Sequence, residues 1–142
     1  MLLIPVVYNI FFLLLGKYDE ELDCHELEED PLLDWFEPRI AAGGCVVEHH
    51  VTDFFPERFF DIVFVLRTEN KTLYDRLKAR KYNEKKIESN VECEIFQTIL
   101  EEARECYDED IVHELASNEE GEIDSNVERI VSWVENWRKD NE

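Results

Sequence analysis

A carboxylate and two imidazoles follow a short apolar run in the segment GGCVVEHHVTDFFPER, residues 43–58. Glu48, His49 and His50 come directly after this run, and Asp53 lies three residues further on. Carboxylates and imidazoles exchange protons and bind metals more readily than other side chains. If residues 45–48 form a buried parallel strand, the cluster lies at its carboxyl end, where the working loops of such sheets converge. The cluster is therefore the first candidate site, and a solvated loop is the alternative.

The cysteines give little support for a metal site or a disulfide framework. None of Cys24, Cys45, Cys93 and Cys106 has the CxxC spacing, which is typical of free thiols in a reducing compartment. A zinc site would need the two adjacent pairs Cys24–His25 and His49–His50. Neighbouring residues on a strand point to opposite faces, so each pair offers one ligand easily and a second one poorly.

The net charge of the chain indicates which kinds of macromolecule it can bind. The chain of 142 residues has a formal net charge of −20 and a pI near 4.4. This field repels nucleic acid phosphates and anionic lipids and attracts basic proteins. We therefore expect no direct DNA binding, and we expect any macromolecular partner to be a basic protein.

The first fifteen residues, MLLIPVVYNIFFLLL, are almost wholly apolar. They are fewer than the ~20 that a membrane-spanning helix needs, and no basic segment precedes them as in a signal peptide. Their composition favours a core strand over residues 4–12, and we expect no membrane association. A membrane or secretory segment, or a segment outside the fold, are the alternatives.

The rest of the chain alternates between predicted strands and helices. Residues 17–39 read as an acidic loop or a frayed helix, because Pro31 and Pro38 interrupt them. Short apolar runs predict buried strands over residues 45–48 and 62–66, and DIVHEL, residues 110–115, is a third predicted strand. A short helical piece is predicted over residues 54–60. Thr68 is the expected cap of one helix, a long helix is expected over 87–107, and Ser125 with Glu128 predicts a capping box for the last. This alternation predicts an α/β domain with a mainly parallel sheet.

Two segments, VVEHHVTDFFPERFFDIVFVLRT and LYDRLKARKYNEKKIESNVECEIF, resemble the adenylate kinase isoenzyme 6 family, and the similarity extends from about Tyr18 to Trp137. The resemblance implies a three-layer fold like that of the P-loop nucleoside monophosphate kinases, formed by residues 18–142 after an atypical segment over 1–17. It implies phosphoryl transfer from ATP to AMP or another nucleoside monophosphate, together with ATPase activity. It also implies a role in rRNA processing and small ribosomal subunit maturation, a basic ribosomal protein as partner, and location in the nucleus and cytoplasm.

The resemblance also implies roles for single residues. Glu48 and His50 match the catalytic pair after the family's strand, and Glu48 would hold the hydration shell of Mg²⁺. Residues 79–89 resemble the LID that closes over ATP, with Arg80 at the phosphates. Asn118 and Glu119 match the loop that meets adenine. The chain departs from the family's pattern at Glu48, His49, Val51 and Glu119.

The largest departure from the family is the phosphate loop. The 142 residues contain no G-x-x-x-x-G-K-[ST], whose backbone N–H groups and lysine hold the phosphates. We therefore expect a fold without the usual first strand, phosphate loop and following helix, impaired catalysis, and an apolar surface left uncovered. Two functions compete: a weakened kinase and ATPase, and a catalytically silent acidic module that binds a basic ribosomal protein.

Overall fold

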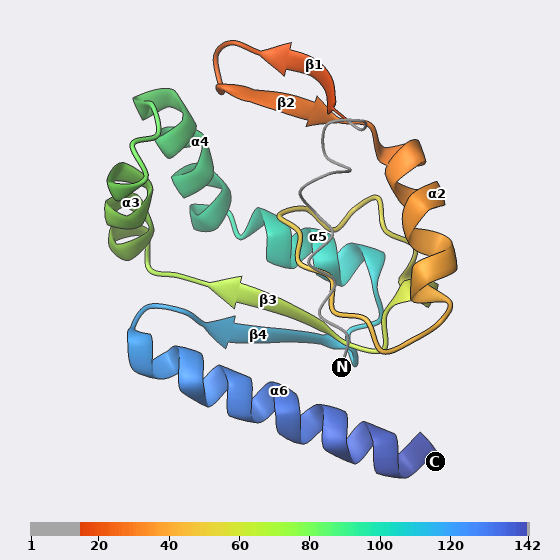
Figure 1. Ribbon diagram of the computed structural model, residues 1–142. Coiled ribbons are helices and arrows are strands. Elements are labelled where there is room, and N and C mark those ends of the chain that lie inside the picture. The colour runs from red at the N-terminus through yellow and green to blue at the C-terminus, as the bar shows by residue number, and fades with distance from the viewer. Residues whose placement is uncertain (1–14, 142) are drawn as a thin grey trace.

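The computed structural model describes residues 15–141 (Figure 1). Its elements are, in order, β1 (Leu15–Asp19), β2 (Cys24–Leu27), α2 (Glu29–Ile40), the 3-10 helix η2 (Glu57–Phe59), β3 (Val63–Arg67), α3 (Asn70–Ala79), α4 (Glu84–Ile95), α5 (Thr98–Cys106), β4 (Val112–Ala116) and α6 (Glu120–Asn141). The strand predicted over residues 4–12 lies outside the described residues. Within the described part of the chain, no helix is both long and apolar enough to cross a bilayer.

Two of the predicted strands form a parallel pair at the centre of the fold. β3 pairs with β4 from Val63 opposite Val112 to Arg67 opposite Ala116. The connection between them runs through α3, α4 and α5, which is the kind of crossover that parallel strands require. The predicted α/β class with a parallel sheet is confirmed.

Helices cover both faces of this strand pair, which gives three layers. α5 lies on one side of β3 and β4, and α6 lies on the other (Figure 1). The core between α5 and the sheet contains Phe55, Val65, Leu100, Ala103 and Tyr107. Burial of such side chains contributes about 25 cal/mol per Å² of apolar surface, so this layer holds the fold together.

The long helix predicted over residues 87–107 is wrong, because the chain breaks between α4 and α5. Gln97 adopts a left-handed conformation with φ 57°. The break leaves Ile95 54% and Phe96 68% exposed, while Leu100 and Ala103 turn into the core. The four-residue apolar repeat spans both helices and therefore hides the change of direction.

The N-terminal region differs from the predicted acidic loop or frayed helix. β1 and β2 form an antiparallel hairpin, and the boundary expected after residue 17 falls inside β1. α2 then tolerates both prolines. Pro31 lies in the first turn, where backbone N–H groups have no partner within the helix, and Pro38 lies in the last turn.

Residues 45–48 do not form the predicted strand. A strand is held by hydrogen bonds to a neighbouring strand, and none within residues 15–141 pairs with this segment. Val46 is 75% exposed, so the expected burial on both faces is also wrong. The predicted short helical piece after this segment is confirmed as η2.

The last helix starts earlier than predicted. α6 begins at Glu120, so Ser125 and Glu128 lie inside the helix and do not form its capping box. The carboxylate of Glu122 accepts hydrogen bonds from the backbone N–H groups of Asn118 and Glu119 instead. On the α6 side of the sheet, Leu66 of β3 is 59% exposed.

Candidate functional site

An ion-pair network lies at the carboxyl end of β3. Arg67 Nε is 2.6 Å from Glu94 Oε1, and these two side chains are only 19% and 17% exposed. The same carboxylate oxygen accepts a hydrogen bond from the Thr68 backbone N–H at 3.2 Å, and Arg67 also reaches Glu114 at 3.4 Å. The network ties the end of α4 to the sheet. Sequence reasoning missed it, although the arginine directly after an apolar strand was a visible signal.

A second arginine fixes the loop after β4. Arg76 of α3 donates to the carbonyl oxygens of Ser117 at 2.6 Å and Asn118 at 2.8 Å. The side-chain oxygen of Asn118 accepts from the Glu69 backbone N–H at 2.7 Å. Asn118 therefore connects the loop to the start of α3, and its carboxamide oxygen is already used.

Glu119 lies beside this connection with its side chain exposed. Its backbone N–H donates to Glu122 Oε2 at 3.1 Å, and the Asn118 N–H donates to the same oxygen. These hydrogen bonds lower the pKa of Glu122. The predicted adenine loop thus leads directly into α6, and the Glu119 side chain at this point is exposed.

The Glu48–Asp53 cluster is split between solvent and core. Glu48 and His50 are exposed, whereas His49 is half-buried with its ring 5.2 Å from Phe54 and 5.4 Å from Phe55, centroid to centroid. Burial lowers the pKa of His49, which favours its neutral ring. The two residues predicted to be catalytic are therefore accessible, and the imidazole between them anchors the segment.

A carboxyl group that the sequence reasoning missed lies close to this segment. Glu102 of α5 has a buried carboxylate oxygen that forms no hydrogen bond with any described residue. The buried hydroxyl oxygen of Thr52 likewise forms none. Burial, and then the nearby charge of Asp53, raises the pKa of Glu102. The Tyr107 hydroxyl donates to the Thr52 carbonyl oxygen at 2.6 Å and so connects the end of α5 to this segment. A carboxyl group with a raised pKa holds its proton to a higher pH. The sequence pattern did not single out Glu102, because the predicted helix continued through Gln97.

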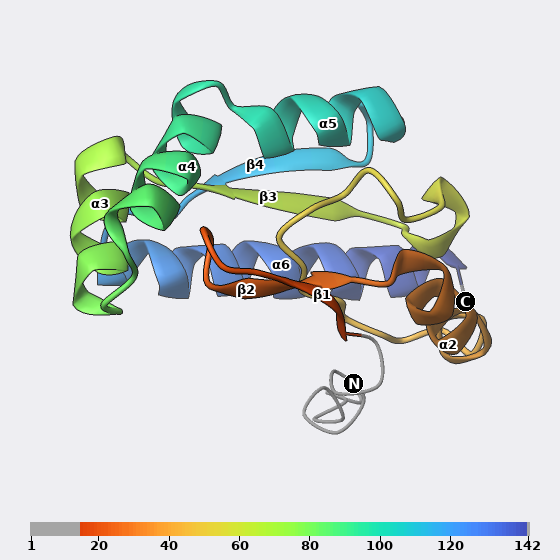
Figure 2. The same cartoon turned by 90° about the horizontal axis from the view of Figure 1, so that it is seen from above.

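The LID-like segment, residues 79–89, contacts the turn of the β1–β2 hairpin (Figure 2). Lys85 forms an ion pair with Glu21, and Lys86 Nζ donates to the Asp23 carbonyl at 3.3 Å. Arg80 is exposed and forms no ion pair with any described residue. Of the basic groups considered for the phosphates, Arg80 is thus the one whose charge is not engaged.

The described residues do not assemble a complete site for Mg²⁺ and ATP. Within residues 15–141, no three His, Cys, Asp or Glu side chains converge on a point where they could share a metal ion. Glu48 would contribute a single exposed carboxylate. The predicted site residues come from three separate segments, and none of the hydrogen bonds or ion pairs described above joins Glu48 or His50 to Arg80 or Asn118.

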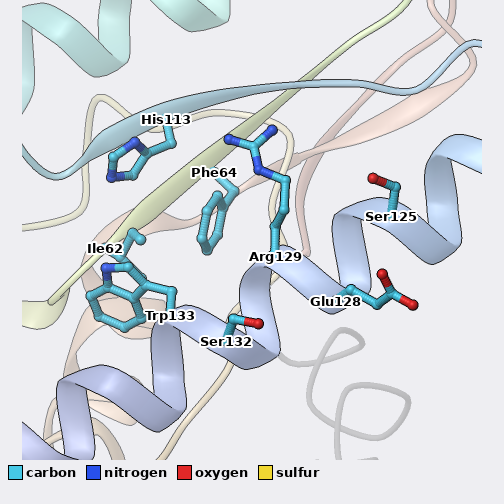
Figure 3. A pocket seen from close by; sticks show the side chains of 8 residues that line it. All are labelled: Ile62, Phe64, His113, Ser125, Glu128, Arg129, Ser132 and Trp133. Atoms are coloured by element: carbon cyan, nitrogen blue, oxygen red, sulfur yellow. The ribbon is translucent and has the colours of Figure 1, made fainter.

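A groove of about 430 Å³ lies elsewhere, between α6 and the sheet (Figure 3). Phe64, His113 and Trp133 form its aromatic side, and Arg129 projects from α6 above it. The other lining residues are Ile62, Ser125, Glu128 and Ser132. None of the predicted site residues lines this groove.

Comparison with known proteins gives consistent matches. Residues 12–97 match a family described as an AAA domain. The chain is 52% identical over 123 residues to the adenylate kinase isoenzyme 6 homolog of Drosophila melanogaster, covering 87% of this chain and 70% of that protein. It is 56% identical over 117 residues to the homolog of Caenorhabditis elegans, covering 81% and 64%. The homolog of Saccharomyces cerevisiae is 46% identical over 120 residues, covering 84% and 61%.

The chain thus spans between 61% and 70% of the length of these three relatives. The three-layer arrangement around a parallel strand pair is consistent with the fold of the nucleoside monophosphate kinases. Residues 12–97, which match the family model, include β3 and the LID-like segment.

Proposed function

Because this chain belongs to the adenylate kinase isoenzyme 6 family, we propose that it is a nucleoside monophosphate kinase and ATPase with weakened turnover. Its substrates would be ATP, with Mg²⁺, and AMP or another nucleoside monophosphate. The observation that carries the kinase assignment is the identity of 52% over 123 residues to an adenylate kinase homolog. The weakening rests on the absence of a phosphate loop from the 142 residues.

The residues of this chain would act mainly by position and charge. Glu48 would orient the water shell of Mg²⁺, and the exposed ring of His50 would orient a water or accept a proton. Arg80, which has no ion-pair partner among residues 15–141, would meet the phosphates with its planar guanidinium. Phosphoryl transfer depends on positioning and electrostatic stabilisation, so a chain without a phosphate cradle should turn over slowly.

A coupled assay of ADP formation from ATP and AMP tests this proposal. The chain itself should give little turnover, and a version with a phosphate loop joined upstream should give much more. In that version Arg80→Ala should reduce turnover strongly, whereas Lys85→Ala is the matched control, because Lys85 already pairs with Glu21. Equal effects of the two substitutions would show that the LID-like role of Arg80 is wrong.

The second candidate function is a catalytically silent acidic module. The net charge of −20 favours a basic ribosomal protein as its partner, in the nucleus and cytoplasm, with a role in small-subunit maturation and rRNA processing. Binding of a peptide rich in lysine and arginine should weaken with salt, because exposed charges are screened beyond ~8 Å at physiological ionic strength. A peptide of equal length with glutamine in place of the basic residues is the control. Binding of both peptides alike would argue against the acidic surface as the binding site.

A further inference from the structure

Helix α6 carries an apolar stripe that the rest of the described chain leaves exposed. Its members are Ile123, Val127, Val131, Val134 and Trp137, which are between 38% and 52% exposed. The edge of the helix next to the stripe faces the sheet, and its half-buried side chains include Asn126, Ile130 and Trp133. Asn126 donates to the Ala116 carbonyl at 2.7 Å, and Ile130 lies at the border between this edge and the stripe. A continuous apolar stripe along a helix is typical of an interaction surface.

The spacing of the stripe is that of a helix pair. Val127 and Val134 are seven residues apart, and so are Ile123, Ile130 and Trp137, which gives the two apolar positions of a heptad. The neighbouring heptad position holds Asp124, Val131 and Arg138. From Ile123 to Trp137 the stripe therefore covers two heptads, or about 21 Å of the 22-residue helix.

Charge is distributed unevenly along the same helix. Its first half has a net charge of −3, from Glu120, Glu122, Asp124, Glu128 and Arg129. In its second half Arg138 and Lys139 are balanced by Glu135 and Asp140. Neither Asp124 nor Arg138 forms an ion pair with any residue between 15 and 141. A parallel helix pair would bring the two acidic halves together, whereas an antiparallel pair places each acidic half against a half whose charges balance, with Asp124 near Arg138 of the other helix.

We propose that the α6 stripe is a homodimer interface, in which α6 packs antiparallel against α6 of a second copy. A two-fold axis near residue 131 places Val127 beside Trp137 of the second copy and Ile130 beside Val134 of the second copy. The same register brings Asp124 opposite Arg138 of the second copy, once at each end. Such an interface is closed, because the same surface of both copies is used.

The net charge predicts how this dimer responds to salt. Two copies with a charge of −20 each repel one another at long range, and salt screens this repulsion. The dimer should therefore strengthen as salt is raised, whereas binding of a basic peptide should weaken. The two proposals can therefore be tested separately, because salt should change dimer formation and peptide binding in opposite directions.

Sedimentation velocity of the 142-residue chain, over a concentration series at low and high salt, tests the interface. The chain should change from monomer to dimer with concentration, more readily at high salt. Val131→Asp should be monomeric under conditions in which the matched control Asn136→Asp is still dimeric, since residue 136 is exposed on α6 away from the stripe. Far-UV circular dichroism should show that both variants keep their helices.

A charge swap tests the register independently of the apolar residues. Asp124→Arg should weaken the dimer at least several-fold, and adding Arg138→Asp should restore it. A monomer at every concentration would overturn the proposal. Growth beyond dimers, or equal association of Val131→Asp and Asn136→Asp, would also overturn it. If Asp124→Arg had no effect, the antiparallel register would be wrong.

Discussion

Glu94→Gln tests whether the network at the end of β3 stabilises the fold. Glu94 Oε1 accepts from Arg67 Nε at 2.6 Å and from the Thr68 N–H at 3.2 Å, and both charged side chains are less than one-fifth exposed. Glutamine keeps the shape but removes the charge. Hydrogen bonds to charged groups contribute about 1.5–3 kcal/mol and neutral ones about 0.5–1.5 kcal/mol. The free energy of unfolding should therefore fall by about 1–2 kcal/mol.

Urea unfolding followed by circular dichroism measures this change. Glu101→Gln is the matched control, because Glu101 pairs with Arg104 at 3.0 Å with both side chains about half exposed. Both variants remove one negative charge from a chain with net charge −20. The general reduction in charge repulsion is therefore similar in the two, and the difference between them reports the local contacts. Exposed pairs contribute about 0–1 kcal/mol, so the control should change little. Equal losses in the two variants would refute the assignment of a buried network.

Three further predictions concern the core and the helix break. Leu100→Ala removes a side chain that is 2% exposed and should cost about 2–5 kcal/mol in urea unfolding; a loss below 1 kcal/mol would contradict the packing of α5. Gln97→Gly relieves a positive φ of 57° and should raise the free energy of unfolding by up to about 1 kcal/mol, so a clear loss would argue against the break. Burial raises the pKa of Tyr107 to about 12, above its value of about 10 in the unfolded chain. Its contribution is therefore complete below pH ~10 and is lost as the pH rises toward ~12, and Tyr107→Phe should flatten this alkaline part of the stability curve.

The sequence predicted those elements whose signal is local. The apolar run that became β3 is bounded by polar residues, and the central residues Val65 of β3 and Leu115 of β4 are buried in the fold. The parallel pairing of these two strands was predicted because helices lie between them in the sequence. The family resemblance was likewise readable, because DFFPER and YNEKK are specific segments that do not depend on the fold.

The failures depend on neighbours that a sequence pattern does not show. Residues 45–48 have the composition of a strand, yet a strand also needs a partner, and residues 15–141 provide none. The repeat through Ile95 and Ile99 continues across Gln97, so nothing in the spacing marks the left-handed residue. Glu122 displaced the capping box at Ser125 because its carboxylate reaches two backbone N–H groups.

The candidate site residues could be named from the sequence, but their positions relative to one another could not be predicted. Glu48, His50 and Arg80 are exposed, while Asn118 is used in the connection between β4 and α3. Glu102 was missed because its burial depends on the direction that α5 takes after the break. Their proposed roles in the family's reaction remain predictions.

Calorimetric titration of Mg-ATP into the 142-residue chain tests the central claim most directly. The claim is that the chain has the kinase family's sheet and LID-like segment without a cradle for the phosphates. We expect no site of micromolar affinity, which would correspond to about −8 kcal/mol of binding free energy. Saturable micromolar binding, accompanied by thermal stabilisation of the chain, would contradict the claim and would mean that another loop of this protein holds the phosphates.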